Sequence, residues 1–445
     1  MTAMPRGYSA RQVAARVVAR SLDGGAFAAA VLDSELEKAV QLDGRDRALA
    51  TELVYGCLRV EPWLEGEIER FTRTKGAKDS SVRAHLVVAA FQLFFTRVPP
   101  FAAVSEAVSS VRAERGPKVG AFANAVLRRV AMRAAMASHP SREEAAFAST
   151  PTWLRESLER SLSLDGAREF LKAGGEPPSV ALRLEHAGER LAWLTRLRET
   201  VSGAKFEPGR LSPMCILVRG AGNPESLPGY DEGAWSVQEE GAQLAALAVG
   251  AQEGDFVLDA CAGRGNKTAV LARAVGPTGA VDACDLGSQK LERLQTEFRR
   301  LGLHVRDTFS VDWTVGSGEV KREYAHVLVD APCTGVGTVR RRPEIALRRG
   351  AKDLQALAQT QKAIICRAAE HVRKGGTLLY VVCSILREEC EEVIREVLAE
   401  RPELEPASFD VPAMREWCGD ASSVRLLPNI HGTDGYFLAR LRRRA

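Results

Sequence analysis

Several features that mark other protein classes are scarce or missing in this 445-residue sequence. It has nine cysteines and no pair in the pattern C-x-x-C. Disulfide scaffolds and many zinc or redox sites need dense or closely spaced cysteines, so we expect reduced thiols and no metal site. The longest apolar run, residues 86–95, is about half of the ~20 residues that a membrane helix needs. We therefore expect a buried helix there and no membrane partner.

The N-terminal residues lack the apolar core and the small-residue cleavage site of a secretory signal, so we expect a cytoplasmic protein. The net charge of +4 allows a polyanionic partner but does not require one. The hydrophobic fraction of 45% and the charged fraction of 27% are typical of folded globular proteins. Because the length exceeds what one core organises, we expect two or three domains.

The pattern along the chain predicts three domains. Residues 1–137 have apolar residues at helical spacing and predict an all-helical domain. Residues 138–235 are interrupted by proline and glycine and predict a small mixed connector domain. From residue 236 to 445, strands such as FVLDAC and AHVLVDAPC alternate with helices. This alternation predicts an α/β fold with a doubly wound, parallel, Rossmann-like sheet, whose ligands lie beyond the carboxyl ends of the strands.

A glycine turn follows the first of these strands. The strand ends at Asp259, and Gly263 and Gly265 lead into a helix. Such a turn either lets the backbone approach a ligand closely or is merely structural. The next strand ends at Asp285, about 20 residues after the turn, where an acid can bind ribose hydroxyls or cap the following helix. Together these positions indicate an adenosine-containing ligand.

Two cysteines stand at the ends of two later strands. Cys333 follows Asp330 in VDAPC, and Cys383 ends the strand TLLYVVCS. Most free cysteines are small buried core residues, but these two should face one crevice of the sheet. A thiolate that adds to carbon 6 of cytosine makes carbon 5 nucleophilic, while an acid near ring nitrogen 3 stabilises the adduct and a base later removes the carbon-5 proton. Two cysteines and an aspartate suit this chemistry, which favours S-adenosylmethionine over a hydride-transfer cofactor.

At these residues the sequence resembles the bacterial 16S ribosomal RNA cytosine-5 methyltransferases of the RsmB (Sun, Fmu) type, in the NOL1/NOP2/Sun family. The matching stretches, in family order, are SVQEEGAQLAALAV, VLDACAGRGNKT, VDAPCTGVGTVRRRPEI, LLYVVCSILREECEEVI and LLPNIHGTDGYFLARL. In addition, AFANAVLRRV at residues 121–130 is similar to the signature of the NusB-like RNA-binding domain. The resemblance implies methylation of a cytosine in 16S ribosomal RNA, with S-adenosylmethionine as the cofactor.

The resemblance also implies residue roles. Cys383 would be the nucleophile, Cys333 would assist product release, and Asp330 would serve both catalysis and cofactor binding. The other implied cofactor-binding residues are Cys261, Ala262, Gly263, Arg264, Gly265, Asn266, Lys267, Asp285 and Asp312. The family usually has C-A-A-P-G-G-K in this loop, so Arg264 and Asn266 depart from residues that shape the turn.

Arg340, Arg341 and Arg342 follow the Cys333 loop and predict contact with RNA phosphates, although charge runs are often only solvated surface. Because the target base must be unstacked, the substrate should be unassembled or partly unfolded RNA. We expect a monomer. Two alternatives stay open: a DNA cytosine-5 methyltransferase, which would use Cys333 as the nucleophile, and a non-catalytic RNA-binding or ribosome assembly factor.

Overall fold

The computed structural model describes residues 8–23, 26–72, 79–136, 138–175 and 178–445. By its internal contacts the chain forms two compact units. The first comprises residues 1–156, 171–176 and 339–349, and the second comprises residues 157–170, 177–338 and 350–445. Among the described residues, no helix combines the length and the apolar composition needed to cross a membrane.

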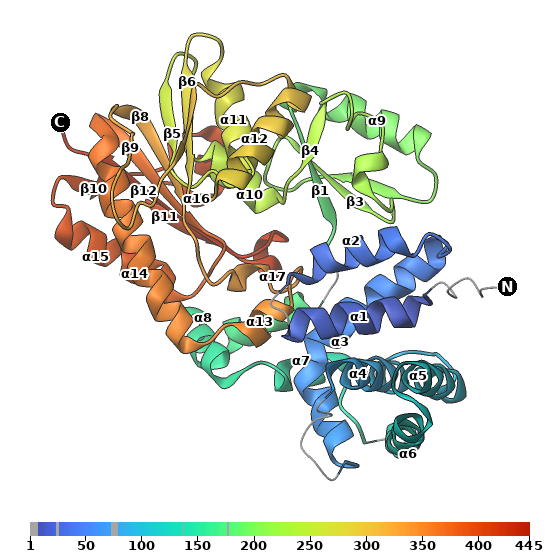
Figure 1. Cartoon of the computed structure of the whole chain (residues 1–445). Helices are drawn as coiled ribbons and strands as arrows, with labels where there is room; N and C mark the ends of the chain where they lie inside the picture. The colour runs from blue at the N-terminus through green and yellow to red at the C-terminus, as the bar shows by residue number, and fades with distance from the viewer. Residues whose placement is uncertain (1–7, 24–25, 73–78, 137, 176–177) are drawn as a thin grey trace. The chain divides into compact units, whose positions relative to one another are not determined.

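The first unit is built from helices that surround one apolar core. The helix α4 is the most buried of them and contains the apolar run that the sequence analysis placed inside the protein. Within α3, Val60 has non-helical backbone angles and Pro62 follows it, as expected where proline removes a helical hydrogen bond. The helices, drawn in blue to teal in Figure 1, are α1 (Ala10–Asp23), α2 (Ala28–Lys38), α3 (Gly44–Glu69), α4 (Ser80–Phe95), α5 (Pro100–Arg115), α6 (Pro117–Ala134) and α7 (Arg142–Ala148).

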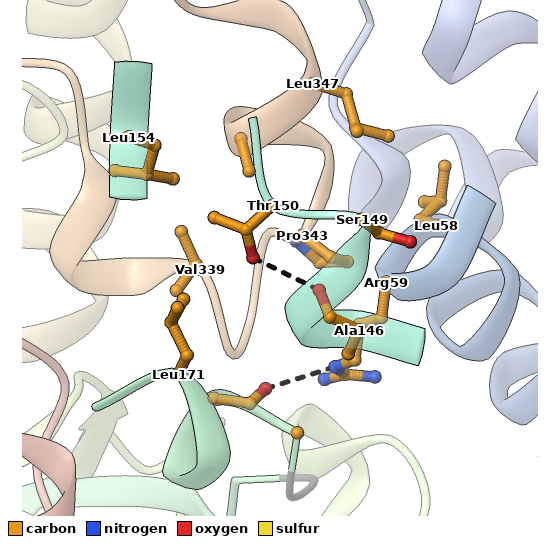
Figure 2. Close-up of a pocket in the computed structure, with 13 residues that line it drawn as sticks. Leu58, Arg59, Ala146, Ser149, Thr150, Leu154, Leu171, Val339, Pro343 and Leu347 are labelled. Atoms are coloured by element: carbon orange, nitrogen blue, oxygen red, sulfur yellow. Dashed lines mark hydrogen bonds between the residues drawn. The ribbon is translucent and has the colours of Figure 1, made fainter. Parts of the chain in front are cut away.

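A segment from much later in the sequence completes this unit. Residues 339–349, here called the returning segment, include the short helix α13 (Glu344–Arg348). The buried Glu344 accepts a hydrogen bond from the backbone N–H of Ala28 (3.0 Å), the first residue of α2. Figure 2 shows side chains of the returning segment, among them Val339 and Leu347, lining a pocket together with residues of α3 and the start of α8. The helical unit therefore combines the N-terminal residues with a segment from the later part of the sequence.

The second unit contains a small and a large sheet. The small antiparallel sheet has the order β2-β3-β1-β4, and α9 packs against β2 and β3. The boundary expected between residues 235 and 236 falls inside β4, because that strand pairs with β1. The elements of this part are α8 (Thr152–Gly174), which the two units share, β1 (Val180–Leu184), α9 (Arg190–Thr200), β2 (Lys205–Pro208), β3 (Cys215–Arg219) and β4 (Trp235–Val237).

The large sheet has the order β10-β12-β9-β8-β5-β6-β7, and β11 pairs with β12. The strands from β9 to β7 are parallel, which confirms the doubly wound Rossmann-like fold. The last strand differs from the expectation of an all-parallel sheet, because β12 runs antiparallel to β9 and its start lies beside the end of β9. The strands are β5 (Phe256–Asp259), β6 (Ala280–Asp285), β7 (Asp307–Ser310), β8 (Tyr324–Asp330), β9 (Val372–Val382), β10 (Leu404–Pro406), β11 (Ser423–Leu426) and β12 (Tyr436–Arg443).

Helices cover both faces of this sheet (Figure 1). Along β9, Leu378 and Tyr380 belong to a core shared with α14 and α15, whereas Leu379 and Val381 belong to a core shared with α10 and α11. This alternation is the two-residue period of a strand buried on both sides. The helices are α10 (Glu240–Leu247), α11 (Asn266–Val275), α12 (Ser288–Leu301), α14 (Ala351–Ala368), α15 (Glu391–Glu400), α16 (Pro412–Cys418) and α17 (Pro428–His431).

Candidate active site

The strand order places the candidate residues along one edge of the large sheet. The chain runs from β5 outward to β6 and β7 and then returns to β8 on the other side of β5. The crevice at such a switch point is where doubly wound sheets bind ligands. Asp259, Asp285 and Asp330 are the last residues of β5, β6 and β8, and Cys383 directly follows β9. The structure therefore brings the predicted strand-end residues to a common edge.

The loop after β5 depends on two glycines with positive φ. Gly263 has φ 59° and Gly265 has φ 86°, a region that other residues adopt at a cost. A Cβ atom at Gly265 would lie 2.6 Å from the Leu294 side chain of α12, so this position also requires a close approach. The side chains of Arg264 and Asn266 are exposed, and neither prevents the turn from forming.

The beginning of α11 presents backbone donors toward this loop. The N–H of Ala269 bonds to the carbonyl of Gly265 (2.8 Å), whereas the N–H groups of residues 266–268 have no acceptor among the described residues. Asp285 accepts hydrogen bonds from the N–H groups of Gly263 (3.1 Å) and Gly287 (2.8 Å). Its carboxylate thus ties the end of β6 to the loop, and both interpretations of Asp285 remain compatible with its position.

Asp259 is a fully buried carboxyl group beneath the loop. Burial raises its pKa to about 7, although the hydrogen bond from the Thr268 hydroxyl (2.7 Å) favours the ionised form. Its second oxygen, Oδ1, is buried and has no hydrogen-bond partner among the described residues. A buried polar atom without a partner is costly, which is typical of a position prepared for a ligand or a water molecule.

The two cysteines from β8 and β9 meet at this edge. Their Sγ atoms are 3.3 Å apart, and both side chains are partly buried. The hydrogen bond with Cys383, together with burial, raises the pKa of the Cys333 thiol well above its usual value. The hydrogen of the pair is therefore held more firmly by Cys333.

An ion pair lies beside the cysteines. Lys267 Nζ is 2.5 Å from the Asp330 carboxylate. Burial by itself would lower the pKa of Lys267, but the charge of Asp330, its hydrogen bond and the charge of Cys383 raise the pKa above the usual value. Lys267 therefore stays protonated and supplies positive charge close to Cys383.

The Cys333 loop is held by residues that the sequence analysis did not identify. The buried Glu389 accepts hydrogen bonds from the N–H (2.7 Å) and the hydroxyl (2.5 Å) of Thr334, and from Gln361 Nε2 (2.9 Å). Further along the loop, the N–H of Gly337 bonds to the carbonyl of Cys383 (3.0 Å). No sequence signal pointed to Glu389, because it is 55 residues from Thr334 and is one of several acids in LREECEEV.

Two other sets of predicted residues differ in where they lie. Asp312 follows β7 at the same edge of the sheet, where Ser310 pairs with Asp285 and the N–H of Val311 bonds to the carbonyl of Asp285 (3.1 Å), and its role stays a prediction. Asp312 is exposed, and its carboxylate accepts hydrogen bonds from the N–H (2.9 Å) and the hydroxyl (2.6 Å) of Thr314. The three arginines 340–342 lie on the returning segment and belong to the helical unit, not to the unit that contains the cysteines. Arg342 is exposed, and its guanidinium is 5.2 Å from the centre of the Phe27 ring.

Comparison with known proteins decides the family. Residues 246–442 match the family described as 16S rRNA methyltransferase RsmB/F, and residues 8–132 match the NusB family. "Ribosomal RNA small subunit methyltransferase B" of Sodalis glossinidius is 32% identical over 98% of this chain and 98% of its own length. The chain belongs to the RsmB family of ribosomal RNA methyltransferases. The RsmB protein of Citrobacter koseri is 30% identical over 97% of this chain and 98% of its own length.

Solved structures share the RsmB-like fold. PH0851 aligns with a TM-score of 0.83 at 23% identity, over 99% of this chain and all of that chain. NSun6 from Pyrococcus horikoshii, whose structure was determined with SFG, aligns with a TM-score of 0.58 at 19% identity, over 66% of this chain and 98% of that chain. These likenesses confirm the fold that the motifs predicted.

S-adenosylmethionine is the cofactor of this methyltransferase family, and the edge of the sheet fits it. The free N–H groups at the start of α11 suit a carboxylate, and Asp285 at the end of β6 suits ribose hydroxyls. The partnerless oxygen of Asp259 is a further indication that this edge is built for a ligand. Residues 261–267, Asp285, Asp312 and Asp330 stay the residues predicted to hold the cofactor.

Proposed function

We propose that this protein methylates carbon 5 of a cytosine in 16S ribosomal RNA, with Cys383 as a transient covalent nucleophile. The observation that carries the proposal is the 3.3 Å separation of the Cys383 and Cys333 Sγ atoms at the ends of two parallel strands. A single structural thiol would not need a second one within contact distance. The names of the relatives, ribosomal RNA small subunit methyltransferase B, support the RNA substrate.

The chemistry needs one addition and one elimination. The Cys383 sulfur forms a bond to carbon 6, and the electron pair of the 5,6 double bond makes the new bond from carbon 5 to the methyl carbon. S-adenosylmethionine supplies that methyl group in an electrophilic, sulfonium-bound form. Removal of the carbon-5 proton then allows the Cys383 thiolate to leave, which restores the aromatic ring.

The two cysteines have different roles in the addition and the elimination. Because the pKa of the Cys333 thiol is raised, Cys333 keeps its hydrogen, and we assign the role of nucleophile, with the negative charge that it needs, to Cys383. Lys267 stabilises that charge, since its ammonium is close enough to Cys383 for each charge to affect the other. The Cys333 thiol, whose Sγ is 3.3 Å from that of Cys383, can donate its hydrogen to the Cys383 thiolate as it leaves, which suits Cys333 to the elimination step.

Asp330 is the group that we assign to ring nitrogen 3 of the cytosine. It ends β8 three residues before Cys333, and its bond to Lys267 fixes its carboxylate beside the cysteines. A proton that Lys267 passes to Asp330 and that Asp330 donates to this nitrogen stabilises the negative charge that the addition places in the ring.

RNA contact is the second part of the proposal. Residues 1–137, of which residues 1–7, 24–25, 73–78 and 137 lie outside the described residues, would recognise RNA, and the arginines 340–342 would bind phosphates. The match of residues 8–132 to the NusB family and the exposure of Arg342 support this assignment. For Arg342→Gln we expect weaker binding to all RNA sequences and a salt dependence of affinity reduced by about one phosphate contact.

A denaturing gel tests the covalent mechanism. Each cysteine variant is incubated with ribosomal RNA and S-adenosylmethionine, and methyl transfer is measured in parallel. Cys383→Ala should give no shifted band and no methylated RNA. Cys333→Ala should still attack and methylate, and should accumulate a stable protein–RNA complex, because the step that frees the enzyme is impaired.

Cys418→Ala is the matched control, since Cys418 lies on α16 and belongs to neither strand end. It should methylate like the natural protein. A shifted band with Cys383→Ala together with none for Cys333→Ala would assign the nucleophile to Cys333, as in DNA cytosine-5 methyltransferases. A natural protein that binds RNA and never transfers a methyl group would instead be a non-catalytic assembly factor.

A further inference from the structure

Arg183 is a fully buried cation in the middle of the small sheet. It lies on β1, where its backbone faces Cys215 of β3 and Ser236 of β4, and its side chain is 1% exposed. A buried guanidinium is unfavourable unless its N–H groups are paired. The partners of Arg183 therefore show what this charge is placed to hold.

The partners connect the small sheet to the cofactor loop. Arg183 forms an ion pair with Glu185 and donates hydrogen bonds to Gln238 Oε1 (2.9 Å) and to the backbone carbonyl of Asn266 (2.6 Å). Asn266 is the first residue of α11. The same Glu185 also accepts from Arg273 (3.2 Å) near the end of α11. Arg183 on β1 and Glu185, which directly follows that strand, thus contact α11 near both of its ends.

The hydrogen bond from Arg183 to the carbonyl of Asn266 is not a contact that packing alone would favour. A positive charge at the N-terminus of a helix opposes the helix dipole, so ordinary packing would not favour an arginine there. Because a peptide group is planar and trans, binding the carbonyl of Asn266 directs the N–H of Lys267 away from Arg183. That N–H is one of the donors at the start of α11 that have no acceptor among the described residues.

The loop before α11 has few features of its own that would restrict its conformation. Gly265, which precedes α11, provides no side-chain cap, and the loop of residues 261–267 contains two glycines with positive φ and no proline. Without the fixed φ of proline, the free loop has more conformations to lose when it binds a ligand. A contact from outside the loop would remove part of that cost.

We propose that Arg183 is a positioning residue for S-adenosylmethionine: it fixes the first peptide group of α11, so the small sheet is part of the cofactor site. The proposal concerns cofactor binding and does not depend on which atom of the RNA is methylated. Normal cofactor affinity in the Arg183 variants would therefore not contradict the covalent mechanism. A denaturing gel that contradicts the covalent mechanism would not contradict the role of Arg183.

Calorimetry on the full chain measures the dissociation constant for S-adenosylmethionine, and circular dichroism measures the unfolding midpoint without cofactor. For Arg183→Met we expect the dissociation constant to rise roughly tenfold or more, as for loss of a charged hydrogen bond. Arg183→Lys should show a smaller rise, because an ammonium cannot span Glu185 and Asn266 together. The double variant Arg183→Met, Glu185→Gln removes the buried carboxylate that Arg183→Met leaves paired with Arg273 alone, so its midpoint should recover while its dissociation constant stays high.

Arg300→Met is the matched control. Arg300 donates to the carbonyl of Trp235 (3.2 Å) and to the Ser236 hydroxyl (2.8 Å), so it anchors the same small sheet without touching the cofactor loop. Its dissociation constant should stay close to that of the natural protein. An equal rise for Arg300→Met, or normal affinity in the double variant, would reduce Arg183 to a stabilising residue and overturn the proposal. If Arg183→Met does not fold, the lysine and double variants decide in the same way.

Discussion

The ends of β5 and β6 and the ends of β8 and β9 lie along one edge of the same sheet, yet they are built differently. At the cofactor side, residues 261–287 form the loop and its acid from one continuous stretch, through backbone N–H groups and two glycines with positive φ. At the cysteine side, Cys333 and Cys383 are 50 residues apart, and the loop between β8 and the returning segment is held by Glu389, Gln361 and Gly435. Local geometry builds the first side, and tertiary contacts build the second.

This comparison predicts that substitutions on the cysteine side, at the ends of β8 and β9, cost more stability than substitutions on the cofactor side, at the ends of β5 and β6. Gly337 is the most restricted position: a Cβ atom there would lie 1.9 Å from the carbonyl oxygen of Gly435 and 2.9 Å from that of Cys383. Because both neighbours are backbone atoms, Gly337→Ala should lower the free energy of unfolding by about 3 kcal/mol and abolish methyl transfer. Chemical denaturation and a methylation assay check this expectation.

Gly316→Ala is the control for that substitution, because nothing lies within 4 Å of a Cβ atom at Gly316. Its free energy of unfolding should change by less than about 0.5 kcal/mol. A stable and active Gly337→Ala protein would show that the cysteine side adapts as readily as the cofactor side.

The second prediction concerns Glu389. Glutamine puts an NH2 group, which cannot accept, in place of the oxygen that accepts from the Thr334 hydroxyl, so the free energy of unfolding should fall by about 1–3 kcal/mol. The Cys333 loop should loosen, and the trapped protein–RNA complex should increase while affinity for S-adenosylmethionine stays unchanged. Denaturing gels and calorimetry measure the two effects separately.

The neighbouring Glu388 serves as a matched control, since it pairs with Arg160 (2.7 Å) and does not contact Thr334. Glu388→Gln should release RNA normally. If it accumulates as much complex as Glu389→Gln, the effect does not come from the Thr334 contact.

On the cofactor side, Asp285→Ala should weaken binding of S-adenosylmethionine by about tenfold to a hundredfold, which corresponds to roughly 1.5–3 kcal/mol for a charged hydrogen bond. The loss has two physical sources, because Asp285 is both the expected ribose partner and the acceptor for Gly263. Calorimetry with the folded variant is the test, and an unchanged dissociation constant would remove Asp285 from the cofactor site.

Asp312 should have the smallest effect. It is exposed, and Thr314 already bonds to one of its two oxygens, Oδ1, so Asp312→Ala should raise the dissociation constant for S-adenosylmethionine by no more than about fivefold, or roughly 1 kcal/mol. Calorimetry under the same conditions allows direct comparison with Asp285→Ala. A larger loss for Asp312 would mean that the cofactor extends further toward β7 than the geometry of Asp285 indicates.

This difference between the two sides also explains what the sequence could predict. The strand that ends at Asp259, the glycine turn and Asp285 follow one another within a short stretch, so periodicity and spacing were enough to locate them. The antiparallel direction of β12 could not be predicted, because nothing in GYFLARLRR indicates which neighbour the strand pairs with. Arg183 and Glu389 were missed for a similar reason, since each acts on a residue more than 50 positions away.

The returning segment has a consequence for how the chain is made. Domains usually fold in order as they emerge during synthesis, the N-terminal one first. Here the acceptor for the N–H of Ala28 is Glu344, and Arg59 donates to the carbonyl of Arg340, so these contacts cannot form until residues 339–349 have been translated. The domain that is synthesised first therefore finishes folding only after β5, β6, β7 and β8 have already left the ribosome.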